Sequence, residues 1–82
     1  MPRVGTVGAI RIYIYGLDHN PPHLHAIIAE RQAEIGITDL RVFSSNLKPK
    51  ELQRVLAWAE TNQVALLREW HHAEKGEEVN PV

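Results

Sequence analysis

The sequence predicts an α+β fold, in which a three- or four-stranded antiparallel β-meander packs against one long C-terminal α-helix. Three observations predict it: apolar residues alternate along the first half of the chain, short connections separate the alternating segments, and apolar residues recur at helical spacing in the second half. The apolar face of the sheet and the apolar stripe of the helix can then bury each other. We expect one domain over residues 1–82.

Alternating apolar side chains mark the predicted strands. Ile10, Ile12 and Ile14 alternate with polar or aromatic side chains, which is the period of a half-buried strand. Short connections lead to the later segments, and strands joined in this way form an antiparallel meander. The expected strands cover residues 9–15, 24–29 and 33–37, with a short fourth strand over 40–43 in the four-stranded version.

A single long helix is predicted for the second half of the chain. Pro49 suits the first helical turn, where its missing N–H costs nothing, and apolar residues recur from there at spacings of three, four or seven. This stripe keeps its phase across Thr61 and Asn62, which favours one helix over two. We therefore expect a helix over 49–73 and a polar tail over 74–82.

Composition narrows the range of functions. Nine basic and ten acidic residues give a net charge of −1, which provides no general field for nucleic acid or an anionic membrane. The absence of cysteine excludes disulfides and thiolate metal ligands. No apolar stretch is long enough to span a bilayer, and the first residues lack the apolar core of a signal peptide. We expect a cytoplasmic protein with no membrane partner.

The segment over residues 18–25, DHNPPHLH, brings three of the five histidines and one carboxylate together around two prolines. Each proline disfavours helix at and before its own position, so the histidines are not expected on a helix. A strand is predicted directly after the prolines, which points His23 and His25 to the same face of the sheet. Their Cβ atoms are then about 6 to 7 Å apart, and His19 can fold back over them.

Metal binding is the first chemical hypothesis for this segment. His19, His23 and His25 supply three nitrogen ligands for a divalent metal such as zinc or manganese. Asp18 can orient one of the rings by accepting its second N–H.

Acid–base chemistry on RNA or another phosphodiester is the second hypothesis. His23 and His25 then give and take the protons, and Asp18 again orients a ring. Arg11 can hold the anionic group, and Tyr13 can stack or donate a hydrogen bond. The structural alternative is that the histidines and their polar neighbours only cap the turn and bond backbone carbonyls.

Trp58, Thr61 and Ala65 lie off the predicted apolar stripe of the helix. An exposed tryptophan beside small residues is a common anchor for a protein partner. The alternative is that the indole covers an edge of the sheet. A small cognate protein or a second copy of this chain is the partner expected at such an anchor.

Three segments together resemble a known family. DHNPPHLH over residues 18–25, NLKP over 46–49 and VLAWAE over 55–60 are similar to the small prokaryotic family known as domain of unknown function 4160. Every fixed position of the family signature D-H-x-P-P-H-x-H is matched, and the resemblance covers nearly the whole chain.

The resemblance implies a role but no established reaction. Genes of this family often lie beside a second small gene in an arrangement like a toxin–antitoxin pair. The implied site residues are the matched ones, Asp18, His19, His23 and His25.

From the residues and the resemblance together we expect a toxin-like component of a two-gene module that acts through the histidines, as a nuclease or another phosphodiester hydrolase. The alternatives are a non-catalytic interaction module that binds and regulates a cognate partner, and a metal-binding domain without turnover.

Overall fold

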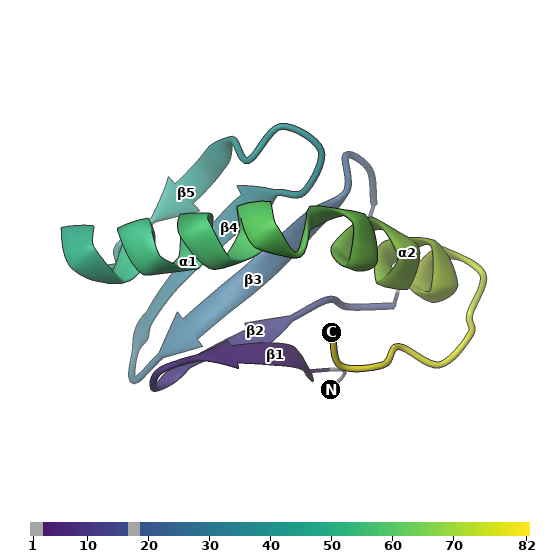
Figure 1. Cartoon of the computed structure of the whole chain (residues 1–82), viewed down its shortest axis with the longest axis horizontal. Coiled ribbons are helices and arrows are strands. Elements are labelled where there is room, and N and C mark those ends of the chain that lie inside the picture. The colour runs from purple at the N-terminus through teal and green to yellow at the C-terminus, as the bar shows by residue number, and fades with distance from the viewer. Residues whose placement is uncertain (1–2, 17–18) are drawn as a thin grey trace.

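A computed structural model describes residues 3–16 and 19–82 as an antiparallel sheet followed by two helices (Figure 1). The five strands follow one another across the sheet in chain order, so the topology is a meander. The elements are β1 (Arg3–Val7), β2 (Ile10–Tyr13), β3 (His23–Ile28), β4 (Arg31–Gly36), β5 (Val42–Ser45), α1 (Pro49–Thr61) and α2 (Gln63–Glu74).

The core lies between one face of the sheet and the two helices, which cross that face (Figure 1). Ile10, Ile12 and Ile14 are buried there, as their alternation predicts. Leu66 and Trp70 of α2 are also buried, which confirms that the helical stripe faces the sheet. None of the helices in the described part of the chain has the length and apolar character needed to cross a bilayer.

The prediction of three or four strands is wrong, because the sheet also contains β1 at its edge. β1 has a glycine at its centre, Gly5, and this weakens the strand signal in the sequence. The indole of Trp58 packs over that glycine, and a Cβ built there would lie 2.8 Å from Cη2 of the ring and nearer still to Cζ2. The last strand also starts two residues later than expected, because Leu40 adopts a positive φ of 58° in the preceding turn.

The prediction of a single long helix is also wrong, because the helix is interrupted at Asn62. The amide of Asn62 donates from Nδ2 to the Trp58 carbonyl at 2.8 Å, a local bond of the kind that competes with helical pairing. Gln63 then donates from Nε2 to the carbonyls of Ile37 and Thr38 at 2.8 and 2.9 Å. Gln63 therefore fastens the start of α2 to the residues that follow β4.

An ion pair joins β4 to α1 at the other end of the contact between the sheet and the helices. Arg31, the first residue of β4, donates from Nε and Nη2 to the Glu51 carboxylate at 3.1 and 2.6 Å. The Lys48 N–H donates to the same carboxylate at 2.8 Å at the start of α1. The Arg31 guanidinium and the Lys48 N–H hold the pKa of the Glu51 carboxyl below its usual value.

The last residues, predicted as a polar tail, return to the body of the protein and end beside the start of β1 (Figure 1). Val82 donates its N–H to the Val4 carbonyl at 2.7 Å. Buried Glu69 accepts the Asn80 N–H at 2.9 Å and also binds Arg68 and His72. The segment after α2 therefore covers part of the β1 edge.

Gly5 is expected to contribute to the stability of the fold, because the Trp58 indole packs directly over it. Gly5→Ala should lower the free energy of unfolding by about 1 to 3 kcal/mol, since the new Cβ overlaps the Trp58 ring. The matched control is Gly16→Ala, because a Cβ at Gly16 meets nothing within 4 Å. Chemical denaturation of both variants measures the difference, and equal stabilities would contradict the close packing.

Glu69 should make the stability of the fold decrease at acid pH. Burial alone raises the pKa of the Glu69 carboxyl, but hydrogen bonds from Asn80, Arg68 and His72 outweigh it and hold the pKa below the ordinary 4.5. The lowered pKa means that the stabilisation is complete above pH 4.5 and is lost as the pH falls further.

Glu69→Gln should therefore cost about 1 to 3 kcal/mol of unfolding free energy at neutral pH, because charge-assisted bonds to a buried carboxylate are lost. The deficit relative to wild type should shrink as the pH is lowered towards 3. Denaturation curves recorded at several pH values measure it, and a deficit independent of pH would refute this role.

Candidate functional site

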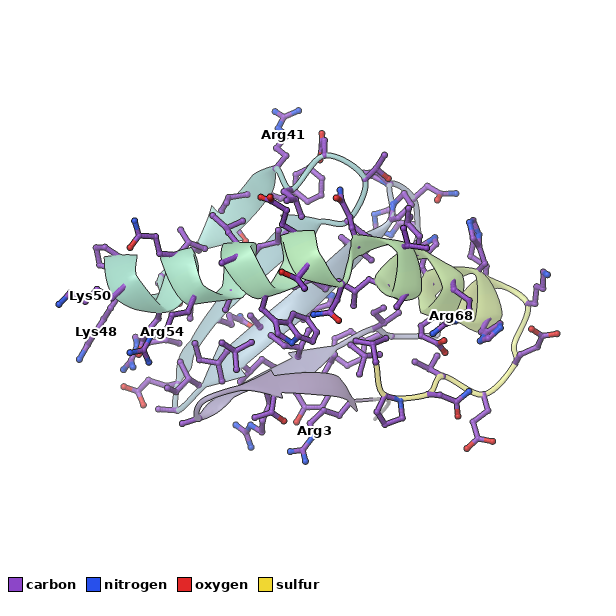
Figure 2. The ribbon with its side chains drawn as sticks, in the orientation of Figure 1. Arg3, Arg41, Lys48, Lys50, Arg54 and Arg68 are labelled. Carbon is purple, nitrogen blue, oxygen red and sulfur yellow. The ribbon has the colours of Figure 1, made fainter. Side chains whose placement is uncertain are left out.

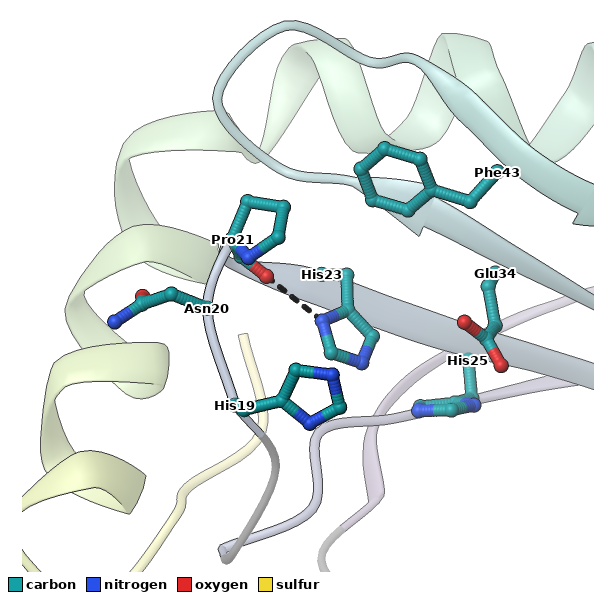
Figure 3. Close-up of a pocket in the computed structure, with 7 residues that line it drawn as sticks. All are labelled: His19, Asn20, Pro21, His23, His25, Glu34 and Phe43. Atoms are coloured by element: carbon teal, nitrogen blue, oxygen red, sulfur yellow. Dashed lines mark hydrogen bonds between the residues drawn. The ribbon is translucent and has the colours of Figure 1, made fainter.

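A cavity of about 220 Å³ opens beside the start of β3 (Figure 3). Its walls come from the turn before β3 and from three neighbouring strands. The lining residues are His19, Asn20, Pro21, His23, His25, Glu34 and Phe43. All three histidines of the proline-containing segment therefore line one hollow.

Strand geometry explains how the histidines meet. His23 and His25 alternate with Leu24, which is buried in the core, so both rings leave the opposite side of β3. The ring centroids of His23 and His25 are 5.1 Å apart. His19, in the turn, has its ring centroid 6.4 Å from that of His23. The prediction that His23 and His25 share a face is confirmed, and His19 joins them.

His23 is held on two sides. Its Nδ1 lies 2.8 Å from the Pro21 carbonyl oxygen (Figure 3), next to the cis peptide bond between Asn20 and Pro21. Its ring also packs against the buried indole of Trp70, with the centroids 5.2 Å apart. A carbonyl only accepts hydrogen bonds, so Nδ1 carries the proton and donates it. In the neutral ring of His23, Nε2 is therefore the nitrogen that carries no proton.

His25 stands between an acidic and an aromatic neighbour. Glu34 is its register partner on β4, and both side chains line the cavity. On the other side Tyr13 is its register partner on β2, and the Tyr15 ring lies 4.5 Å from the His25 ring. Imidazole and carboxylate groups on adjacent strands give the cavity groups that can take and give protons.

The other three predicted catalytic residues have different outcomes in the structure. Tyr13 lies next to His25, as expected. Arg11 is exposed on the same face, but it pairs with Ile27 farther along β3 and does not line the cavity. Asp18 falls outside the described residues, so its predicted role in orienting a ring stays a prediction.

The metal hypothesis gains no support from the part of the chain that the structure describes. Within residues 3–16 and 19–82, no group of three or more histidine, aspartate or glutamate side chains is arranged to hold a metal ion. Binding of zinc or manganese by His19, His23 and His25 remains a prediction from their spacing.

The predicted partner anchor is engaged within the chain. Trp58 is half-buried over Gly5 of β1, which matches the interpretation that the indole covers a sheet edge. Thr61 is exposed and donates its hydroxyl to the Ala57 carbonyl, and Ala65 is half-buried in α2. A partner surface at these residues remains a prediction.

Glu34, Phe43 and Tyr15 were not among the predicted site residues. The alternation of Glu34 with Ile35 predicts that Glu34 shares a face with His25, and the structure confirms this placement. Phe43 had no such signal, since it belongs to the strand whose predicted position was shifted. Its ring centroid lies 6.5 Å from that of His23.

A comparison with protein families places these residues in a wider group. The family described as Domain of unknown function (DUF4160) matches residues 9–71, well over half of the chain. The chain belongs to the DUF4160 family. The matched region contains the whole histidine segment and starts after β1, so the DUF4160 match includes the cavity but not the first strand. No curated protein and no solved structure matches the chain.

The tautomer of His23 can be tested directly. In the neutral ring the proton should reside on Nδ1, because the Pro21 carbonyl can only accept it. Long-range ¹⁵N–¹H correlation spectra of the histidine side chains, recorded above pH 8, distinguish the two tautomers. His71, exposed on α2, is an internal reference for a ring outside the cavity. A His23 ring protonated on Nε2 would contradict the proposed geometry.

Proposed function

We propose that this DUF4160 chain is the toxin-like component of a two-gene module and hydrolyses phosphodiesters in the histidine cavity. The observation that carries the proposal is the convergence of His19, His23 and His25 on one hollow. A turn that served only to connect two strands needs no such convergence. The gene pairing implied by the family supports the two-gene part of the proposal.

The cavity suits proton transfer at a phosphate group. In neutral His23 the proton is on Nδ1, which donates it to the Pro21 carbonyl, so Nε2 is the basic nitrogen of the ring. With 5.1 Å between their ring centroids, His23 and His25 can both reach oxygen atoms of one phosphate at hydrogen-bond distances of about 2.6 to 3.2 Å. One ring takes a proton from the nucleophile, and the other gives a proton to the leaving oxygen. His19 lines the same hollow and can bind a non-bridging oxygen when it is protonated.

A second candidate function is an interaction module that binds and regulates a cognate partner. The observation that favours it is the β5 edge, where all four strand residues are exposed. The chain's own last residues cover part of the opposite edge, at β1. An uncovered edge strand can pair with a strand of another chain. This function does not depend on the histidines.

Substitution of the histidines separates the two candidates. His25→Ala and the double variant His23→Gln/His25→Ala should lower the rate of phosphodiester hydrolysis by at least about 100-fold, the usual contribution of one acid–base group. Induced wild-type protein should arrest bacterial growth, and the double variant should not.

The matched control is His71→Ala, because His71 is a histidine bound to Glu74 on the exposed side of α2. It should hydrolyse and arrest growth like wild type. Circular dichroism verifies that each variant is folded. Growth arrest that survives the double substitution would refute the assignment and favour the interaction module.

A further inference from the structure

One face of the sheet lies opposite the two helices and carries the cavity. Across all five strands, register pairs place one row of polar side chains side by side. The row consists of Arg3, Tyr13, His25, Glu34 and Ser44. In the part of the chain that the structure describes, both helices pack on the other face (Figure 1). This row and the cavity beside it form what we call the outer face.

Aromatic rings extend along the outer face on both sides of the histidines. Tyr13 and Tyr15 stack with their centroids 6.0 Å apart and their planes within 5°. On the other side of the His23–His25 pair, Phe43 keeps 40% of its surface exposed. An exposed phenylalanine contributes little to the core, so its place at the rim of the cavity fits contact with a ligand.

Arginines stand near both groups of rings. Arg3 is the register partner of Tyr13, and exposed Arg11 lies two residues before Tyr13. At the other end the Arg41 guanidinium lies 5.9 Å from the centre of the Phe43 ring. Arg3 and Arg41 project from opposite edges of the sheet (Figure 2). Proteins that bind single-stranded nucleic acid combine aromatic rings, on which the bases stack, with nearby cations that contact the phosphates.

We propose that the outer face binds single-stranded RNA, with one base stacked on Tyr13, another on Phe43, and the phosphodiester between them at His23 and His25. Three interstrand spacings of about 4.8 Å separate β2 from β5, which gives a platform about 14 Å wide. Sheets with aromatic side chains on an uncovered face bind two or three RNA bases in this way. The inference rests on the proposed function and specifies its substrate.

RNA is the phosphodiester that needs the fewest groups from this cavity, because its own 2′-hydroxyl is the nucleophile. The proton of that hydroxyl passes to the neutral nitrogen of one histidine, and the 2′-oxygen forms a bond to phosphorus. The bond from phosphorus to the 5′-oxygen breaks, and the leaving oxygen takes a proton from the other, protonated histidine. The products are a 2′,3′-cyclic phosphate and a 5′-hydroxyl, so atoms and charge balance without a further reactant.

Binding is tested with a single-stranded oligoribonucleotide that carries 2′-O-methyl groups throughout and therefore cannot be cleaved by this route. Fluorescence anisotropy should show that Tyr13→Ala and Phe43→Ala each weaken binding about tenfold or more, as the loss of one stacked base does. Tyr13→Phe and Phe43→Tyr keep the rings and should stay within about twofold of wild type. Arg11→Gln should reduce the slope of log affinity against log salt by about 0.7.

Cleavage is tested separately with unmodified RNA and with DNA of the same sequence. We expect RNA fragments that end in a 2′,3′-cyclic phosphate and intact DNA. Cleaved DNA, tight binding of duplex RNA in preference to the single strand, or alanine variants that bind like wild type would overturn the inference.

The two proposals fail in different ways. Hydrolysis of a small chromogenic phosphodiester without any binding of the methylated oligoribonucleotide would keep the proposed function and overturn the RNA-binding face. Binding that depends on the Tyr13 ring, without hydrolysis of the chromogenic phosphodiester and without cleavage of unmodified RNA, would refute the hydrolase and retain the face.

Discussion

Burial of the apolar face of the sheet beneath α1 and α2 determines which side chains remain for chemistry. Residues alternate between the two faces of a strand, so once Ile12, Leu24 and Ile35 are in the core, their neighbours must lie on the outer face. Those neighbours include Tyr13, His25 and Glu34, which the meander topology then aligns across adjacent strands. The packing that stabilises the fold thus also assembles the candidate site.

His23 connects the core to the cavity. Trp70 packs against one side of its ring, and the Pro21 carbonyl engages its Nδ1. A ring with two such contacts has little freedom to move, and a ring held in one orientation suits a catalytic role. The histidines at the end of α2 are different, because His71 and His72 bind the nearby carboxylates of Glu74 and Glu69. His71 and His72 therefore have a structural explanation, and the bond from His23 to the Pro21 carbonyl is of the kind that the structural alternative predicts.

The features that depend on local periodicity could be predicted from the sequence, and those that depend on tertiary contact could not. The buried isoleucines, the helix start at Pro49 and the shared face of His23 and His25 all follow from local patterns. β1 was missed because its central glycine lowers the strand signal. The contact that requires this glycine comes from the Trp58 ring, which lies more than fifty residues away in the sequence. The break at Asn62 was missed because the stripe keeps its phase through it. Likewise, the place of Phe43 beside His23 depends on the register of β5.

The near-neutral charge of the chain argues against nucleic acid only if its cations are spread evenly, and they are not. Arg31 and Arg68 are bound to Glu51 and Glu69. Three further cations gather around the start of α1, away from the outer face (Figure 2): Lys48, Lys50 and Arg54. The outer face and its edges keep Arg3, Arg11 and Arg41, together with the carboxylates of Glu34 in the row and Asp39 beside Arg41. Three phosphate contacts release few counterions, so a single strand would bind with moderate affinity and a shallow salt dependence, with a slope near −2. Such binding relies on stacking more than on charge, and a neutral composition does not exclude it.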